Sequence, residues 1–306
     1  MLSHSIGVID IGSNTVLMTC GRLNSQGKLD LLLEMQDVAR LSEGLQDEGK
    51  LKNEAKERVL NVLKKFKKSA QEKGIENIIA AGTAAFRRAS DGKEFAKDIE
   101  KNLGIPTQIL SGEQEAYYSF LSVENSFSAD QKSLGMIDIG GGSTELVLKS
   151  VQNATSLPIG TVKLSEEHLV SHPISNSDWQ ALKEDIQQKL QNSALDLDQK
   201  PEIWVAVAAT PTTLATYLQK LPEFNPQKVH GYCIQLDTLK TSLEKLRQLS
   251  IEDRNSLPGM LPKRAELLPI GGLILQEVME FLKISEITVS YEGLRFGLLW
   301  ENLLKD

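Results

Sequence analysis

The sequence predicts an α/β protein built from two similar domains, and three observations lead to this fold class. The chain has 306 residues, which is more than one compact core usually holds. An apolar segment that leads into a glycine-containing turn occurs near the start of the chain and again near its middle. Segments with strand periodicity alternate with segments with helix periodicity in both halves. We therefore expect one domain at residues 1–125 and a second at residues 126–306.

Composition and charge narrow the functional classes. Hydrophobic residues make up 41% and charged residues 25% of the chain, as in a globular protein that folds throughout. The net charge of −7 disfavours a nucleic-acid binder that relies on a broad basic field. Cys20 and Cys233 are too few and too far apart for a disulfide framework or a cysteine metal site. We find no signal-peptide pattern and no apolar run of roughly 20 residues, and expect a cytoplasmic protein without nucleic-acid or membrane partners.

In the first half, the elements follow one another as strand, turn, strand and helix. Residues 6–11 form an apolar strand interrupted by Asp10, and a turn at 12–15 leads into a second strand at 16–20. Apolar residues at helical spacing predict a helix between 52 and 73. Further strands are expected at 29–33, 77–81 and 107–110. Ser111 is a suitable N-cap for a helix that runs to about residue 122.

The second half repeats this order after a polar segment, residues 124–133, that we expect to link the two domains. A second hairpin begins at residue 134, and Pro211 suits the first position of a helix. The remaining helices are expected at 164–170, 177–195, 236–249, 264–281 and from about 292, and the remaining strands at 203–207 and 286–290. This alternation predicts mostly parallel sheets covered on both faces.

The segment from Asp138 to Glu145 carries the strongest chemical signal. Consecutive glycines let backbone N–H groups approach an anion closely, and the hydroxyls that follow add donors. Asp138 can hold a divalent cation, and Glu145 lies within reach of the same ligand. The alternative is a glycine-rich surface hairpin without a ligand. The predicted phosphate-binding residues of this segment are Gly140, Gly141, Gly142, Ser143 and Thr144.

The first hairpin repeats the pattern. Ser13, Asn14 and Thr15 are predicted phosphate donors, and Asp10 is a further candidate metal ligand at the place of Asp138. The repetition favours the functional interpretation over the structural one. Two such hairpins that face one another would surround a chain of phosphates. We therefore expect a two-lobed, actin/Hsp70/sugar-kinase-like (ribonuclease H-like) fold with a phosphate site in the cleft between its duplicated domains.

Several segments together resemble the exopolyphosphatase and guanosine pentaphosphate phosphohydrolase (Ppx/GppA) family, in its short two-domain form. The resemblance runs over nearly the whole chain. It includes Ile-Asp-Ile-Gly-Ser-Asn at 9–14, Thr-Ala-Ala-Phe-Arg-Arg-Ala at 83–89, and the segments 109–116 and 138–146. The segments 156–164, 229–232, 263–265 and 293–295 continue it. In this order and spacing the segments are specific for the family.

The resemblance implies roles for three side chains. Glu115 matches the general base that orients or deprotonates the attacking water, and Glu145 matches a carboxylate that assists it. Arg87 matches an arginine that contacts substrate phosphate, for which a guanidinium fork is well suited. Mg²⁺ is the implied cofactor, and a homodimer is the implied assembly. Without the resemblance, Glu115 would be read as a helix-N-terminal acid stabilised by the helix dipole.

The sequence does not settle the functional roles of five residues in the second half. Lys163 and Arg264 are either phosphate contacts or surface charges, and His230 lies in a matching segment without an assigned role. Ala208 and Ala209 stand where many family members have glycines, so extra Cβ atoms disfavour nucleotide binding at that turn.

The leading interpretation is a Mg²⁺-dependent exopolyphosphatase. Water oriented by Glu115 would attack the terminal phosphate of inorganic polyphosphate in line and release orthophosphate. Guanosine pentaphosphate is the alternative substrate, and the sequence does not separate the two. An ATP-dependent sugar- or acetate-type kinase and a non-catalytic polyphosphate-binding protein are the more distant alternatives.

Overall fold

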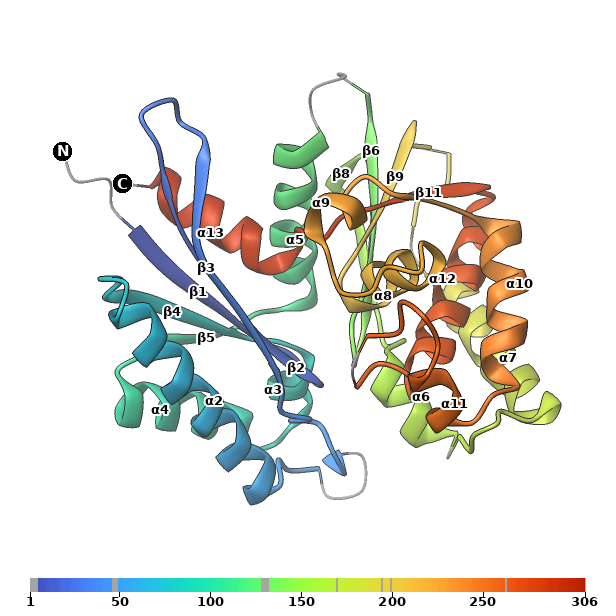
Figure 1. Cartoon of the computed structure of the whole chain (residues 1–306), viewed down its shortest axis with the longest axis horizontal. Coiled ribbons are helices and arrows are strands. Elements are labelled where there is room, and N and C mark those ends of the chain that lie inside the picture. Colours follow the sequence, from blue (N-terminus) through green and yellow to red (C-terminus); the bar gives the residue numbers. More distant parts are fainter. Residues whose placement is uncertain are drawn as a thin grey trace. The chain divides into compact units, whose positions relative to one another are not determined.

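The chain folds into two compact α/β units. The computed structural model describes residues 5–45, 49–127, 132–168, 170–193, 195–198, 200–261 and 263–305. Unit 1 comprises Met1–Ser122 together with Leu294–Asp306, and unit 2 comprises Val123–Gly293 (Figure 1). The predicted two-domain α/β fold is confirmed. No helix in the described ranges has the length and apolar character needed to cross a bilayer.

The sheet of unit 1 has the strand order β3-β2-β1-β4-β5. β1 pairs antiparallel with β2 and parallel with β4, so the first hairpin lies at the centre of the sheet. Alternate residues of β1 enter different cores, with Ile9 and Ile11 on one face and Ile6 and Val8 on the other. The bounds are β1 (Ser5–Ile11), β2 (Thr15–Leu23), β3 (Leu29–Val38), β4 (Asn77–Gly82) and β5 (Thr107–Ile109).

Helices cover both faces of this sheet. α2 (Asn53–Gln71) buries Val59, Leu63 and Phe66 at helical spacing and shares a core with α4 (Gly92–Leu103). α3 (Ala84–Arg88) follows β4, and α5 (Gly112–Phe127) follows β5. The helix expected at 52–73 is therefore present, whereas α4 was not expected from the sequence.

The C-terminal helix α13 (Leu294–Leu304) belongs to unit 1, although residues 126–306 were expected to form the second domain. Its apolar face packs on the second face of the unit 1 sheet, where Leu298 and Leu299 share a core with Val8. Gly297 lets α13 approach α5 closely, because a Cβ there would overlap the backbone carbonyl of Tyr118. The Arg295 guanidinium donates to Thr19 Oγ1 on β2 over 2.6 Å and to Glu34 over 2.9 Å.

The link between the units also differs from the expectation. Residues 124–127 continue α5 as helix instead of forming a polar linker, and the boundary between the units falls inside this helix. Residues 128–131 of the expected linker lie outside the described residues.

The sheet of unit 2 has the order β10-β11-β9-β6-β7-β8. β6 pairs antiparallel with β7 and parallel with β9, which repeats the relation of β1 to β2 and β4. Because parallel strands end at the same edge, the turn after β6 lies beside the end of β9. The bounds are β6 (Leu134–Ile139), β7 (Thr144–Leu148), β8 (Ser150–Leu157), β9 (Ile203–Val207), β10 (Cys233–Gln235) and β11 (Glu286–Val289).

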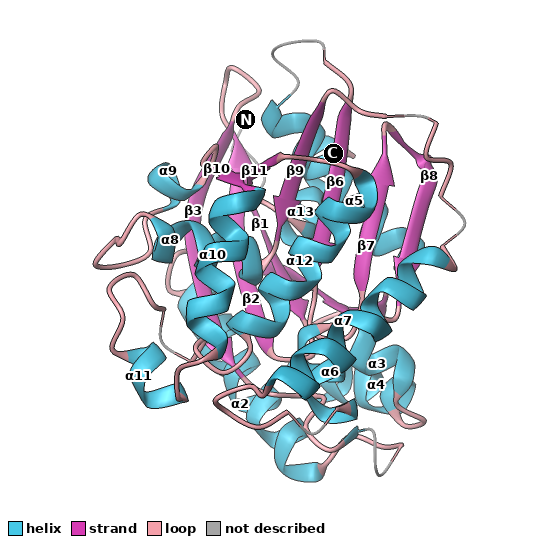
Figure 2. Cartoon of the chain, turned by 90° about the vertical axis from the view of Figure 1, so that its right-hand side faces the viewer, coloured by secondary structure: helices cyan, strands magenta, loops and turns pink. Residues whose placement is uncertain are grey.

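The core of unit 2 is organised around α12 (Leu268–Leu282), which is buried over most of its length. α7 (Asn176–Gln191) and α10 (Leu236–Arg247) pack beside it (Figure 2). The other helices are α6 (Thr161–Glu167), α8 (Ala209–Leu218), α9 (Pro226–Val229) and α11 (Ile251–Asn255).

Candidate active site

The turn after β1 directs its carbonyl groups into the protein. The Gly12 N–H donates to Thr15 O over 3.0 Å and closes the turn. The Ser13 carbonyl accepts from the Ser42 N–H over 3.0 Å, and the Asn14 carbonyl accepts from the two amides at residues 39 and 40. In the described part of the chain, the Ser13 and Asn14 N–H groups make no hydrogen bond. The turn therefore keeps amide donors available for an anion.

The turn after β6 has the same construction. The Gly140 N–H donates to Ser143 O over 2.9 Å, and the Gly140 and Gly141 carbonyls accept from the first three amides of α6 at 2.9–3.1 Å. Within the described ranges, the N–H groups of Gly141, Gly142 and Ser143 form no hydrogen bond. A row of consecutive backbone amides of this kind is typical of phosphate-binding loops.

The segment before α6 fixes this second turn from behind. The Thr144 hydroxyl donates to the Ile159 carbonyl over 2.6 Å. Gly160 is required here, because a Cβ would overlap the backbone of Gly141 and Gly142. The sequence did not assign a role to this supporting segment, since its contacts depend on the packing of α6 against the turn.

Two carboxylates lie side by side behind the second turn. Asp138 on β6 and Glu145 on β7 are directly opposite in the antiparallel register, so their side chains share one face of the sheet. Asp138 is 9% exposed and Glu145 is 2% exposed. Like charges at such positions repel one another, and a divalent cation between their oxygens would relieve the repulsion. Mg²⁺ commonly uses one or two carboxylates together with substrate phosphates, so these residues fit the predicted ion.

The first hairpin lacks this second carboxylate. Asp10 lies opposite Leu17. Leu17 therefore takes the place in unit 1 that Glu145 takes in unit 2. The Thr15 Oγ1 atom is buried and has no hydrogen-bond partner among the described residues. No group of three or more His, Cys, Asp or Glu side chains in the described ranges forms a complete metal cage. The structure therefore gives the two turns the same amide geometry but different carboxylate chemistry.

Arg87 and Glu115 contact each other in unit 1, although 28 positions separate them in the sequence. The Arg87 Nη1 atom donates to a Glu115 carboxylate oxygen and, over 2.7 Å, to the Leu110 carbonyl. Glu115 is 7% exposed, so its negative charge is stabilised mainly by protein groups. The predicted phosphate ligand and the predicted general base therefore form one charged pair.

The start of α5 explains how Glu115 is held. The Ser111 hydroxyl accepts from the Gln114 N–H over 3.2 Å, and the Gln114 side chain accepts from the Ser111 N–H over 2.9 Å. This reciprocal arrangement is a capping box, and it confirms Ser111 as the N-cap. The cap fixes the first turn of α5 and with it the position of Glu115.

Three further residues named from the sequence differ in their surroundings. Lys163 Nζ donates to the Pro158 carbonyl over 3.2 Å and lies 3.6 Å from a Glu167 carboxylate oxygen. Burial lowers the pKa of the Arg264 guanidinium. The His230 ring stacks on Phe127 with a centroid distance of 4.8 Å, which indicates a structural role.

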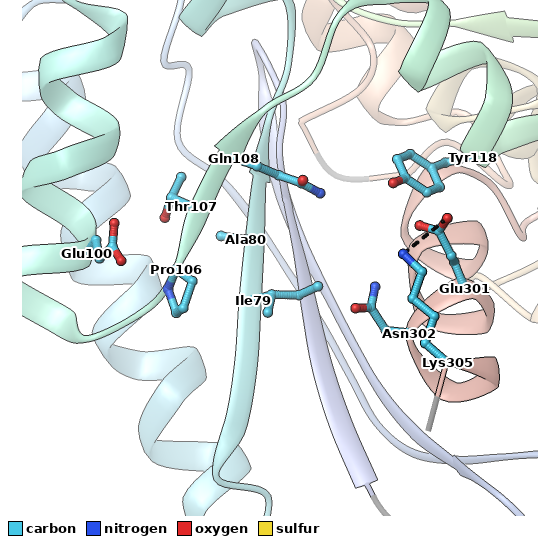
Figure 3. A pocket seen from close by; sticks show the side chains of 10 residues that line it. All are labelled: Ile79, Ala80, Glu100, Pro106, Thr107, Gln108, Tyr118, Glu301, Asn302 and Lys305. Carbon is cyan, nitrogen blue, oxygen red and sulfur yellow. Dashed lines mark ion pairs between the residues drawn. The ribbon is translucent and has the colours of Figure 1, made fainter.

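A pocket of about 370 Å³ lies elsewhere on unit 1 (Figure 3). α4, β4, β5, α5 and α13 contribute its lining. Glu301 forms an ion pair with Lys305 over 3.4 Å. Burial and a hydrogen bond to Glu301 raise the pKa of Tyr118 to about 12. None of the predicted site residues lines this pocket.

Ala208 has a backbone conformation that strongly favours glycine. Its φ of 76° and ψ of −167° lie in a region that costs other residues about 1–3 kcal/mol. Ala208→Gly is therefore expected to raise the free energy of unfolding by about 1 kcal/mol, after the greater chain entropy of glycine is subtracted. Urea unfolding measures this change. Ala209→Gly is the control, because Ala209 is helical and its replacement by glycine should lower the free energy of unfolding. Equal losses in both variants would contradict backbone strain at Ala208.

Comparisons with known proteins identify the family of this chain. The model of the Ppx/GppA phosphatase family matches residues 23–306. Exopolyphosphatase 1 of Mycobacterium leprae is 26% identical over 303 residues, which cover 97% of this chain and 89% of that protein. A bifunctional 3-dehydroquinate synthase/phosphatase of Fusobacterium nucleatum is 28% identical over 96% of this chain and 46% of that protein.

Solved structures give the same result. The Ppx/GppA family member of Aquifex aeolicus superimposes with a TM-score of 0.82 at 28% identity, over 99% of this chain and 98% of that chain. An exopolyphosphatase from Cytophaga hutchinsonii has a TM-score of 0.89 at 24% identity, with 99% and 98% covered, and shares the fold. The resemblance seen in the sequence is confirmed: the chain belongs to the Ppx/GppA phosphatase family and is a hydrolase that acts on phosphoanhydrides.

Proposed function

We propose that this chain is a Mg²⁺-dependent exopolyphosphatase that releases terminal orthophosphate from inorganic polyphosphate. The contact between Arg87 and Glu115 carries the proposal, because it joins a phosphate ligand to a carboxylate that can orient water. Inorganic polyphosphate is the proposed substrate because the relatives named above include exopolyphosphatases. Guanosine pentaphosphate is the competing candidate.

The proposed roles of the residues follow from their contacts. The free amides of the two turns would bind phosphate oxygens, and Ser13, Ser143 and Thr15 would add hydroxyl donors. Arg87 would move part of its hydrogen bonding from Glu115 to the terminal phosphate. Glu115 would then hold the attacking water and accept its proton as the phosphoanhydride bond breaks.

Asp138 and Glu145 would hold the Mg²⁺ ion, and Asp10 is a further candidate ligand in unit 1. When bound, the ion would neutralise charge on the phosphate oxygens. A cytoplasmic location and a homodimer remain predictions that accompany this proposal.

The test is orthophosphate release by the purified protein with Mg²⁺. Long-chain polyphosphate, guanosine pentaphosphate and ATP are compared in parallel at equal concentrations of terminal phosphate. We expect the highest kcat/KM with polyphosphate. Faster hydrolysis of guanosine pentaphosphate would replace polyphosphate by the nucleotide as the substrate. Binding of polyphosphate without release from any of the three would contradict the hydrolytic proposal.

A further inference from the structure

A third polar side chain extends the carboxylate row across the sheet of unit 2. Asp138 on β6 lies opposite Glu145 on β7, and Glu145 in turn lies opposite Ser156 on β8. Side chains of directly opposed residues point to the same face. The Ser156 hydroxyl donates to the Glu145 Oε1 atom over 2.7 Å. The row therefore places a hydrogen-bond donor on the side of Glu145 that faces away from Asp138.

The hydrogen bond from Ser156 restrains one oxygen of the Glu145 carboxylate. Glu145 is 2% exposed, and its side chain has about three rotatable bonds that the backbone register does not fix. A hydrogen bond from a hydroxyl to an ionised carboxylate is stronger than one between neutral groups. Ser156 itself is exposed on the edge strand β8. It therefore lies between solvent and the buried carboxylates of Asp138 and Glu145.

We propose that Ser156 is a positioning residue that orients Glu145 for cation binding and catalysis. The inference rests on the proposed function, because it assumes that Glu145 takes part in phosphoanhydride hydrolysis. Hydrogen bonds to the ligands of a metal ion typically contribute about 10–100-fold to metal affinity or activity. Ser156 does not touch the substrate in this proposal and acts through Glu145 alone.

Ser156→Ala is expected to lower kcat by about tenfold and to raise the Mg²⁺ concentration for half-maximal activity by a similar factor. KM for polyphosphate should stay unchanged, because the phosphate-binding turns are untouched. Ser156→Thr should restore both values, since threonine keeps the hydroxyl. A second readout is the increase in melting temperature on addition of Mg²⁺, which Ser156→Ala should reduce and Ser156→Thr should preserve.

Thr155→Ala provides the matched control. Thr155 is the neighbour of Ser156 on β8 and lies opposite Leu146, so its side chain points to the other face of the sheet. This variant removes a hydroxyl from the same edge strand and should keep the wild-type kcat and Mg²⁺ dependence. Equal losses in Thr155→Ala and Ser156→Ala would assign the effect to the stability of β8 and overturn the inference.

Glu145→Gln separates the inference from the proposed function. If Glu145→Gln is inactive while Ser156→Ala behaves as wild type, the positioning role is wrong and the role of Glu145 stands. If Glu145→Gln keeps full activity, the proposed role of Glu145 fails, and the positioning role fails with it. When both single variants lose activity, the double variant should be no slower than Glu145→Gln alone. A further loss in the double variant would show that Ser156 acts independently of Glu145, against the inference.

Discussion

Glu115→Gln is expected to lower kcat for orthophosphate release by about 10³-fold, within the range that positioned acid–base groups contribute. The amide preserves the size of the side chain and still accepts a hydrogen bond from Arg87. It carries no negative charge to orient or deprotonate water. KM should stay equal or fall, because Arg87 loses its ionic partner and becomes more available to phosphate. Steady-state kinetics with polyphosphate measure both values.

Glu113→Gln is the matched control for this experiment. Glu113 lies in the same first turn of α5 but is exposed, so its replacement removes one acidic charge without changing the buried pair. We expect kcat within about twofold of the wild type, since exposed charges contribute little. A large loss in both variants would point to the charge of the helix N-terminus instead of general-base catalysis. Full activity of Glu115→Gln would exclude Glu115 as the base.

The sequence predicts the duplicated core of each unit well, because local chemistry determines it. An apolar strand, a turn rich in small residues and a second apolar strand favour a hairpin whose backbone is accessible at the turn. The repeat at Asp10 and Asp138 therefore reveals both turns before their geometry is known. The capping box at Ser111 is equally local, because its two partners are three residues apart.

The contacts that organise the candidate site depend instead on tertiary packing. The pairing of Arg87 with Glu115 requires α3 and α5 to meet, and the hydrogen bond from Ser156 to Glu145 requires a particular register of β8. Hydrophobic periodicity does not specify either one. The same limit explains why α13 was assigned to the wrong domain, since an apolar helix face does not reveal which sheet it covers.

Asp138→Asn should have opposite effects on stability and on activity. In the absence of Mg²⁺, it removes one of two like charges that lie directly opposite each other, so the free energy of unfolding should rise by up to about 1 kcal/mol. With Mg²⁺ and polyphosphate, kcat/KM should fall by at least about 10²-fold. The charge stabilisation that a bound metal ion supplies is worth several kcal/mol, and each 1.36 kcal/mol corresponds to a factor of about ten in rate.

Thermal unfolding with and without Mg²⁺ tests the predicted gain in stability, and steady-state kinetics test the predicted loss of activity. Mg²⁺ should raise the melting temperature of the wild type. Asp138→Asn should have a higher melting temperature than the wild type without Mg²⁺, and Mg²⁺ should raise it little further. Asp178→Asn, a change at a partly exposed position in the first turn of α7, controls for the loss of one negative charge. Asp10→Asn tests the equivalent carboxylate in unit 1, which lies opposite Leu17 and should therefore gain no stability from relief of repulsion. If Asp138→Asn loses stability without Mg²⁺ and keeps the Mg²⁺-induced gain, the two carboxylates of unit 2 do not share a cation, and the ion must be held by other residues.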